Sequence, residues 1–389
     1  MNLILLDKLN EFINGPIKIL FSLFIATFDS LIILFNKETS SKKYNLLIKV
    51  DAIGDFFIWL PFAKSFLKNN SNKPTILICN KIVQEVAEKL NLFDFIIPVD
   101  ILKFKSNLLY RYKVIKKVNS LKAYITIHTT FSRNFLIGDS LVRCSDSNKK
   151  VGSKGDHVNQ NFVLKIFSDN WYTKLISTQS SNSEITRNKE FLLNLYPSSK
   201  YDFEFIPKLI NLKKDLKIPR PYIIIFPGAS YYKRMWPVDK FAKLIKELLK
   251  IFSGEIVICG AKSEMNLCSK LESKIKNSRI RNLVGQTSLT EFTEIVRRSK
   301  LLISNETSAI HIAAALDVQS ICILGGGHYG RFTPYPLNSY KKRPISVVNE
   351  MFCFQCNWNC HIKHSKNKPF PCIDLIEFEE VLKKANNCL

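Results

Sequence analysis

Three short segments of the chain combine a tight turn with side chains that can transfer a proton or hold an anion. The first is DAIGD at 51–55, in which Gly54 permits a tight turn and Asp55 follows it. Asp55 suits two roles: it can cap the helix that follows, or it can take a proton from a substrate hydroxyl as a general base. The spacing alone favours the cap.

The second segment is PGASYYKRMWP at 227–237. Gly228 gives the loop its freedom, Ser230 supplies a hydroxyl, and Lys233 and Arg234 supply two positive charges just before a predicted helix. Loop amides, a hydroxyl and cations at a helix start are the groups that hold phosphate oxygens. Taken alone, the same pattern is more typical of an exposed polar loop.

The third segment is SNETSAIH at 304–311. Glu306 offers an acceptor for sugar hydroxyls, and Thr307 and Ser308 offer hydroxyls beside a helix N-terminus. His311 lies about one turn into that helix, where its side chain points back toward the helix start. A single helix histidine is more often structural, but three junction segments facing one cleft favour a ligand site.

Each segment follows a predicted strand and precedes a predicted helix. Strands and helices alternate twice, which indicates parallel sheets with helical crossovers. The first series has strands at 46–50, 75–79, 95–98 and 124–128, with helices through 66 and at 81–90; the second has strands at 222–226, 255–259, 281–284, 301–304 and 320–324, with helices at 238–252, 264–277, 290–299 and 311–316. Between 139 and 183 the alternation fades, and we expect loops with a few short elements. The prediction is an α/β chain of two doubly wound domains, with ligand at the carboxyl ends of the strands.

The composition limits the class of protein. The chain has 389 residues, of which 46% are hydrophobic, and this excludes a disordered or fibrous protein. The length suggests two domains. The 57 Lys and Arg against 33 Asp and Glu give a net charge of +24, which predicts an anionic partner: nucleic acid, an acidic membrane surface or a phosphorylated substrate. A biased genome would also produce this basicity without any function.

The N-terminal stretch at 16–35 is apolar except for Lys18 and Asp29. Its length would span a bilayer, but two charges within it argue against insertion. A helix lying in the membrane plane and a helix packed on the protein's own core are the alternatives. No cleavable signal sequence with a basic start is recognisable before it.

Four of the ten cysteines crowd together near the C-terminus, at Cys353, Cys356, Cys360 and Cys372. Four thiolates at this spacing could form a tetrahedral zinc site with a structural role. A disulfide and free thiols are the alternatives, and the spacing does not separate them.

Taken together, in this order and spacing, the three segments resemble glycosyltransferase family 9, the heptosyltransferase group of lipopolysaccharide core assembly. Members of that family show a Gly-Asp turn after a strand, a PGAS-like loop with a basic residue before Trp-Pro, and an Asn-Asp-Thr-Gly-x-x-His-x-Ala-Ala signature. This chain has DAIGD, PGAS followed by KRMWP, and NETSAIHIAAA in the matching places. The resemblance covers about 44–372 and rests on the agreement of all three.

The resemblance implies a GT-B fold of two Rossmann-like domains facing a central cleft. It implies inverting, metal-independent transfer of a sugar from a nucleotide donor, with no cofactor required. Asp55 falls on the family's proposed general base, Ser230 near the donor diphosphate, and Arg234 on a cationic position that is usually Lys. Thr307 and His311 fall on donor-site positions, and Lys233 and Gly228 lie in the same donor loop.

Two positions depart from the family signature. Glu306 replaces Asp, and Ser308 replaces a Gly, where a side chain could restrict the backbone or crowd the diphosphate. These changes leave the donor open: ADP-heptose is the best-known donor of the family, and a non-catalytic scaffold of a glycan assembly system is the alternative function.

We expect an N-terminal extension and linker at 1–43, an acceptor-side domain at 44–215, a nucleotide-sugar domain at 216–345 and a cysteine-containing segment at 346–389. The stretch 101–122 carries seven Lys or Arg and no acid. It suits a solvated helix face, an anionic membrane or an anionic glycolipid or polysaccharide acceptor. We therefore expect the cytoplasmic face of the bacterial inner membrane and no nucleic-acid partner, since no nucleic-acid module accompanies the charge.

Overall fold

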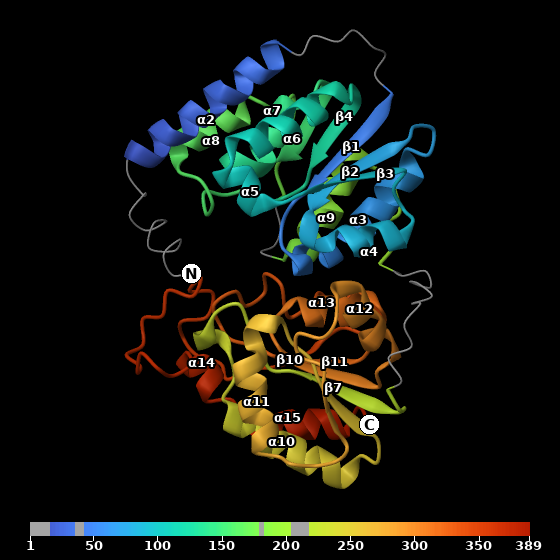
Figure 1. Cartoon of the computed structure of the whole chain (residues 1–389), viewed down its shortest axis with the longest axis vertical. Coiled ribbons are helices and arrows are strands. Elements are labelled where there is room, and N and C mark those ends of the chain that lie inside the picture. Colours follow the sequence, from blue (N-terminus) through green and yellow to red (C-terminus); the bar gives the residue numbers. More distant parts are fainter. Residues whose placement is uncertain (1–15, 36–42, 179–182, 204–217) are drawn as a thin grey trace. The chain divides into compact units, whose positions relative to one another are not determined.

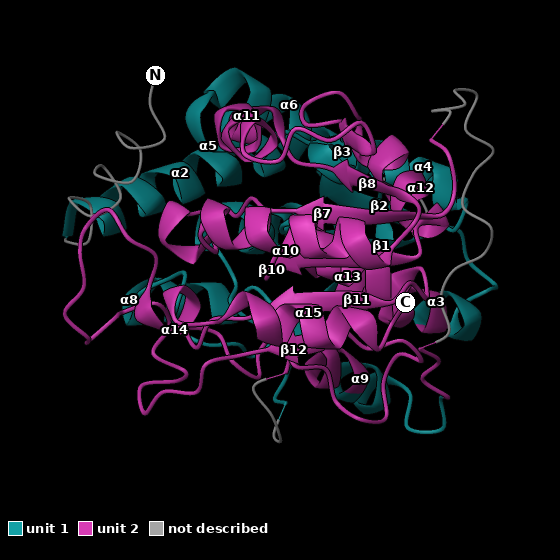
Figure 2. Ribbon diagram, turned by 90° about the horizontal axis from the view of Figure 1, so that it is seen from below, with its two compact units in different colours: residues 1–52, 66–179, 190–199 teal, residues 53–65, 180–189, 200–389 magenta. Residues whose placement is uncertain are grey.

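The computed structural model (Figure 1) describes residues 16–35, 43–178, 183–203 and 218–389. Two compact units make up the chain (Figure 2): unit 1 contains residues 1–52, 66–179 and 190–199, and unit 2 contains residues 53–65, 180–189 and 200–389. The first part of helix α3 (Ile53–Asn69) therefore belongs to unit 2, although the strand before it belongs to unit 1. Each unit is an α/β fold with one parallel sheet, as the alternation of strands and helices predicts.

The sheet of unit 1 has six parallel strands in the order β3-β2-β1-β4-β5-β6. They are β1 (Tyr44–Lys49), β2 (Thr75–Asn80), β3 (Phe95–Val99), β4 (Ala123–His128), β5 (Ser147–Ser153) and β6 (Lys174–Ile176). This is the strand order of the Rossmann fold, and it reverses between β1 and β4. The central strands are buried on both faces, as the uninterrupted apolar run at 46–48 predicts for a parallel sheet.

The strands of unit 1 are connected by short helices. They are η1 (Lys81–Val83), α4 (Gln84–Leu90), α5 (Ile101–Ser106), α6 (Leu108–Ser120), the π-helix η2 (Phe135–Asp139), α7 (Ser140–Cys144) and α8 (Phe162–Asp169). Helix α9 (Glu184–Leu195) is divided between the two units. The basic stretch at 101–122 forms two helices because Asn107 caps α6, its side-chain oxygen accepting from the Tyr110 amide at 2.8 Å.

The region 139–183, where loops and a few short elements were expected, holds two strands of the sheet and two helices. Sequence patterning missed β5 because its first four residues are polar or only partly buried. Burial begins at Val151, so the strand has no apolar run that could mark it.

Helix α2 (Pro16–Leu34), expected as a separate extension, packs on the outside of unit 1 against α6, α7, η2 and α8 (Figure 1). Its acidic residue, Asp29, is fully buried. Arg111 of α6 donates from Nε and Nη2 to the two oxygens of Asp29 at 2.7 and 2.6 Å, and also to the Ser140 hydroxyl at 2.8 Å. Because both carboxylate oxygens of Asp29 are paired inside unit 1, they fix which face of α2 points toward the protein.

The sheet of unit 2 repeats the same plan, in the order β12-β11-β10-β7-β8-β9. Its strands are β7 (Tyr222–Phe226), β8 (Glu255–Ile258), β9 (Ile280–Asn282), β10 (Leu301–Asn305), β11 (Ser320–Ile323) and β12 (Ile345–Val347). All five pairings are parallel, and the order reverses between β7 and β10.

Helices cover both faces of this sheet (Figure 1), with α10, α11 and α15 on one face and α12 and α13 on the other. The helices of unit 2 are η3 (Tyr232–Arg234), α10 (Val238–Ile251), η4 (Lys262–Glu264), α11 (Met265–Ser273), α12 (Leu289–Arg298), α13 (Ser308–Ala315), α14 (Pro371–Asp374) and α15 (Phe378–Asn386). The cysteine-containing segment 346–389 belongs to this unit, and its helix α15 packs on α10, β11 and β12. Trp236 also donates from Nε1 to the Ile376 carbonyl at 2.9 Å.

The Asp29–Arg111 pair gives a stability prediction. Asp29→Ala leaves the Arg111 guanidinium buried without its counter-charge, and breaking a buried pair from one side costs about 3–5 kcal/mol. We expect the unfolding transition of unit 1 to fall by roughly 10 °C in scanning calorimetry. As the control, Glu247→Ala removes the exposed pair with Lys250, where both side chains are more than a third exposed, and we expect little change. Equal shifts in the two variants would contradict a special role for the buried pair.

Candidate functional site

The candidate site of unit 2 lies where the strand order reverses, between β7 and β10. The chain leaves β7 toward β8 and β9 and then returns to β10 on the other side of β7, and open α/β sheets bind ligands at such a reversal of strand order. The loop after β7 is 227–237 and the loop after β10 is 306–307. Both were predicted from the sequence as anion-binding or ligand-binding junctions.

Asn305, the last residue of β10, holds the loop after β7 at both of its ends. Its side chain is fully buried, and Nδ2 donates to the carbonyls of Pro227 at 2.7 Å and Gly228 at 3.2 Å. Its Oδ1 accepts from the Trp236 amide at 3.1 Å. One amide side chain therefore fixes where residues 228–235 lie relative to β10.

Glu306 and Arg234 connect the two loops. Arg234 Nη2 lies 3.3 Å from Glu306 Oε2, and Thr333 donates to Glu306 Oε1 at 3.3 Å. The Glu306 side chain is only 5% exposed. Burial raises its pKa to about 7, although Arg234 and the Thr333 hydrogen bond act in the opposite direction.

The Arg234 guanidinium has further donors available. Its carbon lies 4.4 Å from the centre of the Trp358 ring, which supports one face of the group. Its Nε has no hydrogen-bond partner within the part of the chain that the structure describes. Lys233 contacts a different set of residues: its Nζ lies 3.3 Å from His364 Nε2 and 5.7 Å from the Phe370 ring. Ser230 is exposed.

Helix α13 begins beside this pair. Thr307 is its N-cap, accepting from the Ala309 amide at 3.3 Å, and its hydroxyl lies 3.0 Å from that of Ser304. His311, one turn into the helix, stacks on Tyr335 with Nδ1 2.8 Å from its hydroxyl. Burial lowers the His311 pKa to about 4, so the ring is neutral at neutral pH.

The DAIGD turn reaches α13 through Gly54. A β-carbon on Gly54 would lie 2.7 Å from His311 Cδ2 and 3.6 Å from Ser308 Cα, so this contact requires glycine. Asp55 lies next to it, in the first turn of α3. The N-cap of that helix is Ala52, so Asp55 is not the N-cap residue itself but the third residue of the helix.

The other acid of the turn, Asp51, is held by its own neighbours. Its Oδ2 lies 2.7 Å from Lys49 Nζ and accepts from the Thr130 hydroxyl at 2.5 Å. Burial raises the pKa of Asp51, but Lys49 and Thr130 outweigh this effect and the net pKa is lowered. Of the two acids, Asp51 is therefore engaged with a lysine, and Asp55 lies at the helix start beside α13.

Comparison with known proteins identifies the family. The model of "Glycosyltransferase family 9 (heptosyltransferase)" matches residues 141–363. The chain belongs to this family. It is 27% identical over 207 residues to lipooligosaccharide heptosyltransferase 2 of Campylobacter jejuni, and the match covers 48% of this chain and 61% of that relative. The aligned part therefore spans less than two thirds of the length of that curated relative.

Solved structures of family 9 share the fold. The glycosyltransferase family 9 protein of Veillonella parvula has a TM-score of 0.67 at 15% identity, covering 90% of this chain and 98% of that one. The Escherichia coli ADP-heptose lipopolysaccharide heptosyltransferase II has a TM-score of 0.63 at 14% identity, covering 89% and 98%. The predicted two-domain GT-B architecture is confirmed.

The two departures from the family 9 signature have a structural account. Ser308 is the first residue of α13 and does not have a left-handed backbone, so the freedom of glycine is not needed there. The longer side chain of Glu306 reaches both Arg234 and Thr333. Neither substitution disrupts the junction.

Sequence reasoning missed four residues that shape the site. Asn305 had a visible signal, a polar residue at the end of an apolar strand. Glu264 lies against Gly228, where a β-carbon would overlap its carboxylate, and burial raises the Glu264 pKa. Thr333 and Trp358 come from irregular segments without periodicity, so no pattern marks them.

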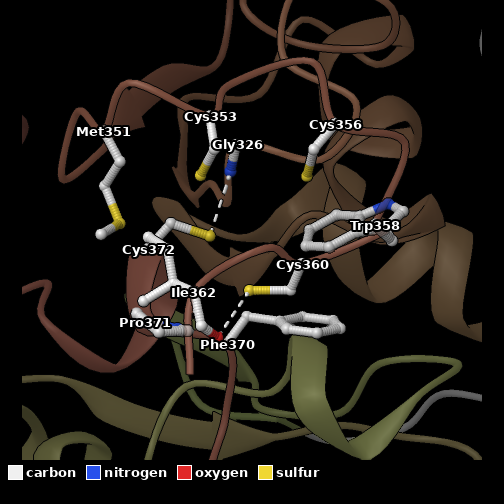
Figure 3. Close-up of a pocket in the computed structure, with 10 residues that line it drawn as sticks. All are labelled: Gly326, Met351, Cys353, Cys356, Trp358, Cys360, Ile362, Phe370, Pro371 and Cys372. Atoms are coloured by element: carbon white, nitrogen blue, oxygen red, sulfur yellow. Dashed lines mark hydrogen bonds between the residues drawn. The ribbon is translucent and has the colours of Figure 1, made fainter. Parts of the chain in front are cut away.

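Cys353, Cys356, Cys360 and Cys372 line one pocket beside Trp358 (Figure 3). All four are free thiols, so the disulfide alternative is not formed. Thiol chemistry suits zinc, but among the described residues no group of three or more His, Cys, Asp or Glu side chains is placed to hold a metal ion. The zinc alternative therefore finds no assembled ligand set among the residues that the structure describes.

The raised pKa of Glu306 predicts a pH dependence of stability. Its pKa is about 7 when folded against an ordinary 4.5, so between these values the folded state binds more protons than the unfolded state. Stability therefore falls as pH rises through this window. We expect the melting temperature of unit 2 to fall less between pH 5 and pH 8 in Glu306→Gln than in the parent protein. Identical slopes would show that Glu306 does not titrate there.

Proposed function

We propose that this protein is an inverting glycosyltransferase that moves a sugar, best matched by heptose from ADP-heptose, to a lipopolysaccharide core or another surface glycan. The observation that carries this proposal is the convergence of the cationic loop after β7, the N-terminus of α13 and the turn bearing Asp55. Its family 9 relatives are named heptosyltransferases, which supports heptose as the first sugar to test.

The donor diphosphate would lie between the loop after β7 and the N-terminus of α13. Arg234 is supported on one face by Trp358, and its side chain is 20% exposed, so phosphate oxygens can reach the guanidinium. The Ser230 hydroxyl, the loop amides and the first amides of α13 add further donors. These groups would offset the charge that develops as the nucleoside diphosphate leaves, so we propose that no metal cofactor is required.

Asp55 would act as the general base. Its carboxylate takes the proton of an acceptor hydroxyl while that oxygen forms a bond to the anomeric carbon. The bond from the anomeric carbon to the diphosphate oxygen breaks on the opposite face, and the electron pair leaves with the nucleoside diphosphate. One such displacement inverts the anomeric configuration. Glu306 and His311 would position the donor, since both lie beside the α13 start.

We also propose that the acceptor is an anionic glycolipid or polysaccharide at the cytoplasmic face of the bacterial inner membrane. The acid-free basic stretch at 101–122 supports an anionic partner on unit 1. A thermal-shift screen with ADP-, GDP-, UDP- and dTDP-sugars tests the donor. Stabilisation by ADP-heptose above the others supports the proposal, and no stabilisation by any of them favours the non-catalytic scaffold.

Asp55→Asn tests the base. Loss of a positioned general base costs about 10²–10⁴ in rate, so we expect kcat to fall by that order while the donor dissociation constant stays the same. Isothermal calorimetry measures donor binding and chromatography of products measures transfer. Asp51→Asn is the matched control, because Asp51 is paired with Lys49, and its kcat should remain near that of the parent. An unchanged kcat in Asp55→Asn removes this residue from the mechanism.

Arg234→Ala tests the donor site. Removing charge-assisted hydrogen bonds to a diphosphate costs about 1.5–3 kcal/mol, so we expect ADP to bind roughly 10- to 100-fold more weakly. Arg234→Lys keeps the charge but not the planar guanidinium, so its affinity for ADP should lie between those of the parent and of Arg234→Ala. Lys233→Ala serves as the comparison, since Lys233 contacts His364, and its effect should be smaller. An equal loss in Arg234→Ala and Lys233→Ala would contradict this assignment.

A further inference from the structure

Helix α2 presents an apolar face to the outside of unit 1. Its inward positions pack on the protein, yet every exposed position except Thr27 is also apolar. The Thr27 hydroxyl is satisfied within the helix by the Leu23 carbonyl at 3.0 Å. The exposed apolar side chains of this stretch are Ile17, Leu20, Phe21, Phe24, Leu31, Leu34 and Phe35. An ordinary surface helix carries polar residues on this side.

Helix α8 continues this apolar surface. It contacts α2 directly and lies beside it in Figure 1. Leu164 of α8 is buried in a small core with Ala26 of α2, which fixes the two helices together. The other side of α8 is exposed and apolar, at Phe162, Val163, Ile166 and Phe167. Two neighbouring helices therefore expose apolar faces, and such patches mark interaction sites.

Positive charge flanks the apolar surface. Helix α6 packs on α2 and α5 packs on α6, and together they expose five lysines without any acid in the stretch 101–122. These lysines are Lys103, Lys105, Lys113, Lys116 and Lys117. Lys105 also lies close enough to Lys18 of α2 for their positive charges to interact.

The buried ion pair between Asp29 and Arg111 limits how α2 can bind a membrane. To span a bilayer, α2 would have to leave unit 1 and take Asp29 out of its two hydrogen bonds with Arg111. Breaking such a pair from one side is costly, and an unpaired carboxylate in the bilayer centre is costlier still. Helix α2 is long and apolar enough to cross a membrane, but its pairing with Arg111 holds it on the surface of unit 1.

We propose that α2 and α8 together form a docking surface for an anionic lipid bilayer, in which both helices lie in the membrane plane. The exposed apolar side chains enter the boundary of the acyl chains, and the lysines of α5 and α6 contact acidic headgroups. This inference specifies the membrane contact of the proposed function and rests on it for the choice of a bilayer as the partner.

A second copy of the chain fits this surface less well. In a two-fold dimer the same patch meets itself, so the lysines flanking one apolar face would approach those flanking the other. An anionic bilayer is complementary to both parts of the surface, because its interior is apolar and its headgroups are negative.

Vesicle flotation tests the proposal with the full-length protein. The parent protein should float with vesicles of phosphatidylethanolamine and phosphatidylglycerol, and less with phosphatidylcholine. Phe24→Glu combined with Phe167→Glu should lower the bound fraction at least tenfold, because both side chains are about half exposed or more, at 61% and 48%, and face outward. Ile251→Glu, at a position 54% exposed on α10 of unit 2, is the matched control and should bind like the parent.

Two further measurements complete the test. Lys113→Glu combined with Lys117→Glu should weaken binding to the anionic vesicles and reduce its salt dependence. Alkaline carbonate should release the bound parent protein, since a surface helix is extracted and a spanning helix is not. Retention after carbonate treatment, or equal flotation of the Phe24/Phe167 variant and the parent, overturns the proposal. A patch that instead drives self-association in light scattering overturns it as well.

Membrane docking and donor binding are measured separately, so a failure of one proposal can be distinguished from a failure of the other. Calorimetry with ADP-heptose in the absence of vesicles reports on unit 2, and the Phe24/Phe167 variant should bind the nucleotide sugar like the parent. Lost flotation with intact donor binding supports the docking surface, whereas intact flotation with no donor binding contradicts only the enzymatic proposal.

Discussion

One buried amide, that of Asn305, holds the candidate site together. It satisfies the Pro227 and Gly228 carbonyls and the Trp236 amide, three backbone groups that would otherwise be left without a partner next to the sheet. Leaving a buried polar group unsatisfied costs about 1–3 kcal/mol. Because the loop it anchors carries Ser230, Lys233 and Arg234, the placement of the cationic groups depends on a residue that has no charge itself.

The C-terminal segment gives the second support of the same loop. Phe370 donates its amide to the Lys233 carbonyl at 2.8 Å, and Trp358 lies under the Arg234 guanidinium. The Trp236 indole and the Lys240 ammonium both reach the Ile376 carbonyl. A segment that looks like an appendage in the sequence therefore fixes the loop after β7 from outside, while Asn305 fixes it from within the sheet.

The sequence predicts the elements whose hydrophobic pattern is regular and misses the residues of irregular segments. Apolar runs such as 222–225 mark the buried strands, and the three Gly- or Ser-bearing junctions mark the loops of the site. Strand β5 was not predicted because only its last three residues are buried. Thr333 and Trp358 were not predicted because loop residues show no hydrophobic periodicity. Residue type alone also gave Lys233 and Arg234 the same role, whereas their contacts differ: one faces His364 and the other faces Glu306.

The interpretation of Asp29 with respect to membrane binding depends on which residue it pairs with. In the sequence it is a charge within an apolar run, which weakens a membrane interpretation. In the structure its charge is neutralised inside unit 1 by Arg111, a residue 82 positions away that no local pattern connects to it. The pair keeps the Asp29 charge off the outer face of α2, where every exposed residue except Thr27 is apolar. The same acid that argues against a membrane span therefore leaves a surface suited to lying on a membrane.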